Sequence, residues 1–255
     1  MYIIDKLEMV LESYNNETIE YILSHYLLAH LDSIEECTLK QISIDTKISQ
    51  ASVIRFCQKI GYKGVTQFMS ALESEYGDLQ ARFNFFKKTD INTLEDMRTS
   101  FIKECEQATT ESILELVKLI HNGHKVMLYG RKSFINSFQY LTAYCLAHHK
   151  EVIISHSLSK NHQQKQFESL EKGDVIIIME PYIEWHTYRE LSYLNGEMLD
   201  HISQTLAHLV FIGQGISKNV DLNIPLPYTY FDYFYKNCFD HLDFRITLGL
   251  KELEE

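Results

Sequence analysis

Residues 38–64 constrain the fold of this chain more than any other stretch, because their pattern predicts two short helices joined by a tight turn. Thr38 and Ser49 each precede a run with helical spacing, and a hydroxyl there caps a helix by accepting a free backbone N–H. Ile48, in the turn, is expected to fill the space between the helices. Gly61 follows the last apolar residue, where glycine favours a left-handed helix end. The buried side of the second helix is expected to consist of Val53, Phe56, Cys57 and Ile60.

Lys47 stands at the turn position where such a pair of helices favours glycine, because the backbone there tends toward a positive φ. A residue with a side chain costs about 1 kcal/mol in that conformation. We expect the packing around Ile48 to offset this cost.

Two helices of this kind indicate a helix-turn-helix, whose second helix enters the DNA major groove and presents its first residues to base edges. Charge agrees with this interpretation, because the stretch contains one acid, Asp45, among five basic residues, whereas the whole chain has a net charge of −11. Local positive charge is what contact with phosphates requires. The alternative is an ordinary helical hairpin inside an all-α domain.

The expected DNA-binding residues follow from their places on the two helices. Gln50, Ala51 and Ser52, at the start of the second helix, should face base edges. The residues expected to contact mainly phosphates are Arg55, Lys59, Lys63 and Lys40. The capping residues Thr38 and Ser49 belong to the same predicted surface.

Composition bounds the protein class. The chain has 255 residues, 45% of them hydrophobic, which is enough for one large domain or two ordinary ones. The acidic net charge argues against nucleic acid bound along the whole chain. No apolar run is long enough to span a bilayer, and the N-terminus does not have the pattern of a signal peptide. Five irregularly spaced cysteines predict reduced thiols in a cytoplasmic protein.

The apolar pattern predicts two domains. Further helices are expected at 1–13, 17–31 and 65–76, so that residues 1–76 form an all-α bundle. Residues 77–96 are expected to be a linker, although its aromatic residues suggest a short helix in contact with the bundle or with a partner subunit. These aromatic residues are Phe83, Phe85 and Phe86.

Residues 97–255 should form an α/β domain with a doubly wound parallel sheet. Short β-branched runs alternate with helical patterns, as expected for strands buried on both faces. The strands are expected at 125–129, 151–155, 174–179, 207–212 and 220–224. The helices are expected at 94–121, 134–148, 161–170, 189–205 and 231–253.

The first domain resembles the helix-turn-helix of RpiR-type bacterial transcriptional regulators. The resemblance covers residues 1–76 and lies in the run Ser-Gln-Ala-Ser-Val-Ile-Arg-Phe-Cys at 49–57, the run Lys-Ile-Gly-Tyr-Lys-Gly at 59–64, and Phe68. It implies binding to double-stranded DNA.

The second domain is similar to a SIS domain, the sugar isomerase fold with which these regulators sense phosphosugars. The similar segments are residues 126–130, 173–178 and 210–213. The sequence departs from the family at both loops that would hold a phosphate. It has Gly-Arg-Lys-Ser at 130–133 in place of Gly-x-Gly-x-Ser, and residues 180–187 contain no serine where the family has Ser-x-Ser-Gly-x-Thr.

The resemblance implies a ligand site at these loops, since ligands of such sheets bind at the carboxyl ends of strands. The expected ligand-binding residues are Gly130, Arg131, Lys132, Ser133, Glu180 and Thr187. Three outcomes stay open. The site binds a phosphosugar through its cationic loop, it binds an amino or otherwise cationic sugar, or it binds nothing and the domain only dimerises.

Other constellations are weaker. Glu180, Glu184 and His186 could move protons in a sugar isomerase. Cys145 with His149, and Cys238 with His241, have metal-like spacing, but core cysteines and surface histidines explain them better, and no metal or cofactor is expected. The aromatic run at 228–235 marks a subunit interface or packs on its own sheet.

The sequence thus predicts a cytoplasmic, non-enzymatic transcriptional regulator, a dimer or tetramer that reads a palindromic operator and does not enter a membrane. Its two recognition helices would lie about 34 Å apart. The alternatives are a sugar-phosphate isomerase or lyase, and an adaptor whose helical hairpin binds protein.

Overall fold

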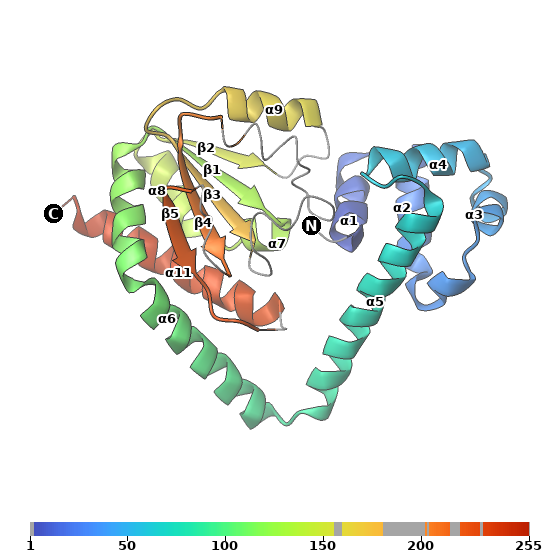
Figure 1. Ribbon diagram of the computed structural model, residues 1–255, viewed down its shortest axis with the longest axis horizontal. Coiled ribbons are helices and arrows are strands. Elements are labelled where there is room, and N and C mark those ends of the chain that lie inside the picture. Colours follow the sequence, from blue (N-terminus) through green and yellow to red (C-terminus); the bar gives the residue numbers. More distant parts are fainter. Residues whose placement is uncertain are drawn as a thin grey trace. The chain divides into compact units, whose positions relative to one another are not determined.

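The chain divides into two compact units, Met1–Lys88 and Thr89–Glu255 (Figure 1). The computed structural model describes residues 3–155, 160–180, 202, 204–214, 220–229 and 232–254. Within this part of the chain, no helix is long and apolar enough to cross a membrane.

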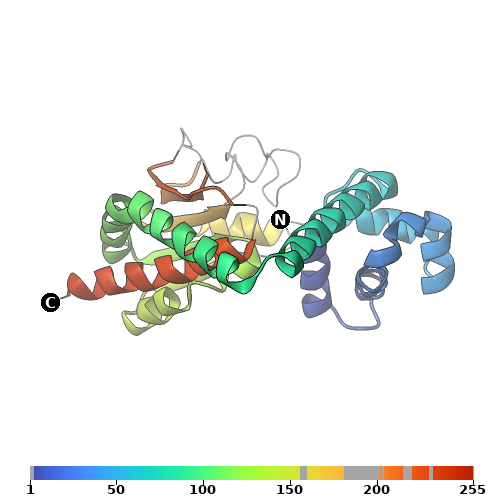
Figure 2. The same ribbon diagram turned by 90° about the horizontal axis from the view of Figure 1, so that it is seen from below.

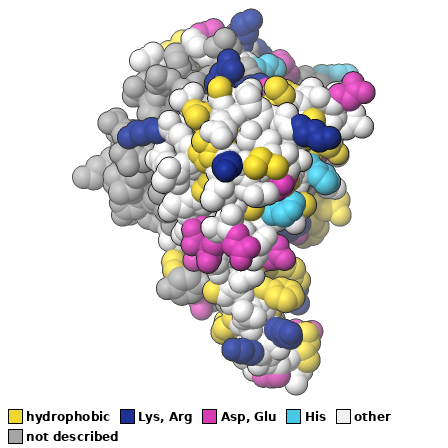
Figure 3. Space-filling model, turned by 90° about the vertical axis from the view of Figure 1, so that its right-hand side faces the viewer, with side chains coloured by type: hydrophobic (Ala, Val, Ile, Leu, Met, Phe, Trp, Pro, Cys, Tyr) yellow, Lys and Arg dark blue, Asp and Glu magenta, His cyan; other side chains and the backbone are white. Residues whose placement is uncertain are grey.

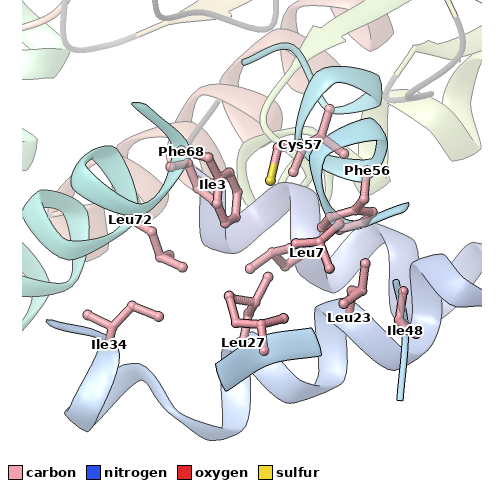
Figure 4. Packing of buried hydrophobic residues seen from close by; sticks show 13 residues of the cluster. Ile3, Leu7, Leu23, Leu27, Ile34, Ile48, Phe56, Cys57, Phe68 and Leu72 are labelled. Atoms are coloured by element: carbon pink, nitrogen blue, oxygen red, sulfur yellow. The ribbon is translucent and has the colours of Figure 1, made fainter. Parts of the chain in front are cut away.

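The first unit is entirely helical, as predicted. Its elements are α1 (Ile3–Ser13), α2 (Ile19–Ala29), the 3-10 helix η1 (Leu31–Glu36), α3 (Leu39–Thr46), α4 (Gln50–Lys59) and α5 (Val65–Lys88). One core joins all of them, and Figure 4 shows Leu7, Leu23, Leu27, Phe56 and Leu72 converging from four different helices. Each of these five side chains is at most 3% exposed, so the amphipathic stripes read from the sequence bury what they were expected to bury.

Two long-range polar contacts fix α1 on this bundle. Lys6 Nζ donates to the Ile60 carbonyl at the end of α4, over 2.9 Å. The carboxylate of Glu75 in α5 accepts the backbone N–H groups of Ile3 and Ile4, at 2.5 and 3.1 Å. A carboxylate there satisfies amides that have no partner within the helix.

The stretch 77–96 is helical except at Thr89 and Asp90, although its sequence suggested a linker. Gly77 lies inside α5, where glycine costs only about 1 kcal/mol. A new helix, α6 (Ile91–Asn122), begins directly after Asp90, whose side chain accepts the Thr93 N–H over 3.0 Å.

The second unit contains a parallel sheet of five strands at the predicted positions. They are β1 (Lys125–Gly130), β2 (Glu151–Ser155), β3 (Val175–Glu180), β4 (His208–Gly213) and β5 (Leu222–Pro225). Their order is β2-β1-β3-β4-β5, so the chain reverses direction across the sheet between β1 and β3. This is the doubly wound arrangement expected from the sequence.

Helices cover both faces of this sheet. The helices are α6, α7 (Lys132–Ile135), α8 (Gln139–Ala147), α9 (Lys160–Glu168) and α11 (Asp232–Glu252). Tyr129, Ile178 and Phe211 pack with Phe167 of α9 on one face. The helices α6 and α11 run side by side on the other face (Figure 2). Most of the helix expected at 189–205 lies outside the described residues.

The single helix expected at 134–148 is two helices, α7 and α8. The chain turns between them, and the first amides of α8 are satisfied by Asp243 of α11. Its two carboxylate oxygens accept the N–H groups of Tyr140 and Leu141, each over 2.8 Å. A cap supplied from more than a hundred residues away leaves no local signal.

The prediction that all cysteines are reduced is wrong for two of the five. Cys105 of α6 and Cys238 of α11 form a disulfide across a sequence separation of 133 residues. Cys37, Cys57 and Cys145 are free.

The aromatic tail packs in part on its own domain, which was one of the two outcomes left open for it. Phe234 and Tyr235 are buried in their own domain, whereas Tyr228 and Tyr233 are 58% and 54% exposed.

Candidate nucleic-acid interface

The turn between α3 and α4 has the geometry that its sequence predicts. Lys47 ends α3 in the left-handed conformation, with φ 59° and ψ 23°. The Ser43 hydroxyl of α3 donates to the Ile48 carbonyl over 2.6 Å, which holds the turn against the helix. Ile48 is 8% exposed and fills the space between the two helices.

The first turn of α4 presents small polar side chains outward. Ser49 caps the helix by accepting the Ser52 N–H over 3.2 Å, and the two hydroxyls are 3.0 Å apart. Gln50 and Ala51 are exposed, and Ser52 is half-buried. The three residues expected to face base edges are therefore at least partly accessible, and the Ser52 hydroxyl lies 3.0 Å from that of Ser49.

The opposite side of α4 is sealed, as predicted. Val53, Phe56, Cys57 and Ile60 are all at most 5% exposed. The helix ends at Lys59. Gly61 follows its C-cap with a φ of 103°, which favours glycine, and the Tyr62 N–H donates back to the Cys57 carbonyl over 3.0 Å. The burial of this side fixes which face of α4 remains available for a ligand.

α3 orients the one acidic side chain of the stretch. Thr38 caps α3 by accepting the Gln41 N–H over 3.1 Å. Asp45 then accepts the Tyr26 hydroxyl of α2 over 2.7 Å and the Gln41 amide over 2.8 Å. These two hydrogen bonds lower the pKa of Asp45, while burial and the carboxylate raise the pKa of Tyr26. Asp45 therefore stays ionised and is held against α2.

Lys40, Lys63 and Arg55 are exposed, and the Arg55 Nε donates to the Ala51 carbonyl over 3.3 Å. Lys59 differs, because its ammonium is 2.6 Å from Glu20 of α2 and lies over the Tyr14 ring, 4.9 Å from its centroid. The hydrogen bond between them raises the pKa of Lys59 and lowers that of Glu20. One of the four expected phosphate contacts is thus already paired inside the unit.

The basic side chains on this side of the molecule are dispersed among uncharged ones, while acidic side chains gather in a separate group (Figure 3). Such a distribution favours contact with phosphates at several separate points over contact along a continuous basic surface.

The second unit brings the carboxyl ends of β1, β3 and β4 together, where the sequence placed a ligand site. Gly130 pairs with Met179, and a Cβ at position 130 would lie 2.7 Å from the Met179 carbonyl oxygen. Gly213 pairs with Glu180, and a Cβ there would lie 2.1 Å from the Glu180 oxygen. Both glycines are needed for this close approach, and β1 and β3 flank the switch point of the sheet.

The residues of the cationic loop after β1 differ in how far they are exposed. Arg131 is 5% exposed, with its guanidinium carbon 4.9 Å from the centroid of the Phe134 ring. Lys132 is half-buried and Ser133 is exposed, both at the start of α7. Glu180 is half-buried at the end of β3. Thr187, and also Glu184 and His186 of the isomerase alternative, lie outside the described residues.

No group of three or more His, Cys, Asp or Glu side chains in the described part of the chain could hold a metal ion. Cys238, one of the residues with metal-like spacing, is disulfide-bonded.

Comparison with known families adds one decisive observation. Residues 1–78 match the family described as "Helix-turn-helix domain, rpiR family". The first unit is an rpiR-family helix-turn-helix domain. The resemblance read from residues 49–64 and Phe68 is thereby confirmed.

The chain also has a relative among curated proteins. An "Uncharacterized HTH-type transcriptional regulator" of Haemophilus influenzae is 23% identical over 115 residues, which are 41% of this chain and 40% of that protein. The chain therefore matches less than half the length of this relative.

Two solved structures are similar to most or to part of the chain. One is the Vibrio vulnificus NanR protein complexed with ManNAc-6P, with a TM-score of 0.49, 13% identity, and coverage of 98% of this chain and 91% of that one. The other is the sugar isomerase domain of an RpiR transcription factor from Sphaerobacter thermophilus, with a TM-score of 0.43, 10% identity, and coverage of 64% and 96%.

The sequence did not indicate two residues of the rpiR-family domain that contact charged side chains of α3 and α4. Tyr26 and Glu20 lie on α2 and contact Asp45 and Lys59, which follow them by 19 and 39 residues. Nothing in the local pattern of α2 marks either residue, because each acts through a tertiary contact.

Proposed function

We propose that this protein is a cytoplasmic transcriptional regulator, without enzymatic activity, that binds double-stranded DNA through α4 of its rpiR-family domain. The observation that carries the proposal is the first turn of α4. Gln50 and Ala51 are exposed there, beside a half-buried Ser52, on a helix whose other side is sealed. That is the arrangement in which a recognition helix enters a major groove.

The charges on α3 and α4 support the same proposal. Arg55, Lys40 and Lys63 are exposed, and the only acid among them, Asp45, is bonded to Tyr26 and Gln41. Three exposed cations against one carboxylate leave this side net positive, which favours contact with phosphates. Thr38 and Ser49 would fix the helix ends that carry these contacts.

The proposed binding is tested by fluorescence anisotropy with labelled duplexes over a range of salt concentrations. The change Arg55→Ala should weaken binding to operator and to random DNA alike, and should lower the slope of log K against log salt by about 1. Gln50→Ala should weaken binding only to the operator. An unchanged salt slope for Arg55→Ala, or no salt-dependent binding by the wild-type chain, argues against a DNA contact here and in favour of a protein-binding hairpin.

We further propose that the regulator is a homo-oligomer reading a palindromic operator, with two recognition helices about 34 Å apart. Operators with half-sites moved apart in steps of one base pair test this geometry. Affinity should peak at a spacing of one DNA turn, whereas a monomeric reader would show no dependence on spacing.

For the second unit, we propose a phosphosugar effector at the carboxyl ends of β1 and β3. The support is the position of Gly130, Arg131, Lys132 and Ser133 at the switch point of the sheet, with Glu180 on the neighbouring strand. Thr187 would complete the site. Thermal-shift measurements with a panel of phosphorylated sugars test it, with the unphosphorylated sugars as matched controls. Stabilisation only by phosphorylated members that is reduced in Lys132→Ala supports the site, and stabilisation by amino sugars instead indicates the cationic-ligand alternative.

A further inference from the structure

The second half of α5 carries an exposed apolar stripe. Figure 1 shows this part of the helix running beyond the other helices of the first unit. Leu79 and Phe83 are 48% and 68% exposed, and Tyr76 and Phe86 are half-buried. These four side chains have the spacing i, i+3, i+7 and i+10, so they lie on one side of the helix.

The stripe also has the periodicity of a helix that pairs with another helix. Counted from Leu72, which is fully buried in the bundle, apolar residues recur alternately after four and three positions up to Phe86. That is the repeat of a coiled-coil seam. A phenylalanine as exposed as Phe83 at the centre of such a seam is costly in water, which favours a helix as its cover.

The charges beside the stripe indicate which kind of helix can cover it. Glu73, Gln80 and Lys87 follow the apolar positions by one residue each, so they line a single edge of the seam, and all three are exposed. The acid is at one end of this edge and the lysine at the other. They are fourteen residues apart, or about 21 Å along the helix, and cannot meet within one chain.

We propose that this stripe pairs with α5 of a second copy of the chain in antiparallel orientation. With the crossing at residue 81, Leu79 meets Phe83 of the second copy and Tyr76 meets Phe86. Glu73 then lies beside Lys87 of the second copy at both ends of the same edge. A parallel pair would bring Arg82 beside Lys87 at both edges and would lose both Glu73–Lys87 contacts. The antiparallel pair brings only one like-charge pair together, Arg82 with Arg82 of the second copy, on the other edge.

This pairing names the partner surface of the regulator proposed above and rests on its being a homo-oligomer. The helix enters its own bundle at Leu72, nine residues from the crossing. The two bundles would therefore be about 27 Å apart along the paired helices. That separation is of the order of the one-turn spacing between recognition helices.

The pairing is tested by cross-linking the full-length chain without DNA. In a background with Cys37→Ser, which removes the one partly exposed free cysteine, Gln80→Cys should give a covalent dimer with a short bismaleimide. Ala81→Cys is the matched control, because Ala81 is exposed at the same height on the opposite side of α5. The Gln80→Cys yield should exceed that of Ala81→Cys several-fold.

A charge exchange then tests the orientation. Glu73→Lys or Lys87→Glu alone converts two attractions into two repulsions, and should lower the Gln80→Cys yield up to about tenfold. The two changes together should restore it. A Gln80→Cys yield no higher than that of Ala81→Cys overturns the pairing, and this result is expected if α6 of the same chain covers the stripe. Failure of the double change to restore the yield also overturns it. Salt-dependent DNA binding would be unaffected by that result, so this inference and the DNA proposal fail separately.

Discussion

Lys59 Nζ lies 2.6 Å from Glu20 Oε1, so the last turn of α4 is tied to α2. The Lys59 side chain is half exposed, and exposed pairs of this kind stabilise a fold by about 0–1 kcal/mol. A phosphate that approached the end of α4 would compete with Glu20 for the same ammonium. Glu20 is therefore in a position to weaken the binding of DNA.

The first prediction follows from this pair. Glu20→Gln should strengthen DNA binding and steepen the salt dependence by about one counterion, because Lys59 becomes available to a phosphate. Fluorescence anisotropy at several salt concentrations measures both effects. Lys59→Gln in the same background should remove the gain. If Glu20→Gln leaves the slope as it was, Lys59 takes no part in phosphate contact.

Local chemistry predicted the helix-turn-helix, because each of its features depends on near neighbours. Thr38 and Ser49 cap through amides three residues away, and Lys47 takes a positive φ because of the turn it occupies. The β-branched strands were predictable for a similar reason, since five short apolar runs alternating with helices have few other solutions. The resemblance of residues 49–64 to RpiR-type regulators then predicted the family of the domain.

The features that the sequence did not predict all depend on distant partners. Tyr26 reaches Asp45 from another helix, Asp243 caps α8 across the fold, and Cys105 bonds with Cys238. The continuation of α5 through Gly77 is a different kind of miss, because a single glycine costs too little to end a helix whose stripe continues beyond it. The burial of Arg131, which was expected to bind the ligand, could not be predicted either, because it depends on how the loop after β1 packs.

The second prediction concerns the turn. Lys47→Gly should stabilise the first unit by about 1 kcal/mol, because glycine adopts the observed φ of 59° without strain. Amide hydrogen exchange of peptides from α3 and α4 in the full-length chain would report the change. The control is Lys40→Gly, at an exposed position in the first turn of α3, which should destabilise by up to about 1 kcal/mol. Equal effects of the two changes would show that the turn at Lys47 is not strained.

The third prediction concerns pH. Burial lowers the pKa of Lys6 to about 8, although Glu75 opposes this shift, while in the unfolded chain its pKa is near 10.5. Between these values the unfolded chain holds a proton that the folded chain has lost, so the stability of the first unit should rise with pH from about 8 to 10.5 and be insensitive to this group below 8.

The measurement for this prediction compares wild type with Lys6→Met, using hydrogen exchange of α1 and α4 corrected for intrinsic rates at each pH. The difference between the two proteins should change by up to about 3 kcal/mol across the window. The comparison cancels the opposite effect of Cys57, whose pKa burial raises to about 12. A difference that stays constant from pH 7.5 to 10 would mean that Lys6 has its ordinary pKa.

The last prediction concerns the cap on α8. Asp243 is 1% exposed and its carboxylate accepts two backbone N–H groups. Asp243→Ala leaves the buried Leu141 amide and the part-buried Tyr140 amide without this acceptor and should cost about 2–3 kcal/mol. Burial is the largest influence on the Asp243 carboxyl and raises its pKa. Just above the ordinary value of 3.8, the folded chain therefore holds a proton that the unfolded chain has lost. The stability of the fold should fall as pH rises through that range. Asp243→Asn should abolish this pH dependence and cost less at neutral pH than alanine, because the amide oxygen can still accept one N–H.

The matched control is Asp240→Ala. Asp240 is exposed on the same helix and pairs with Lys236 over 3.0 Å, so its loss should cost less than about 1 kcal/mol. Hydrogen exchange of peptides from α8 separates the two residues, and equal protection of α8 in both alanine variants would rule out the capping role of Asp243.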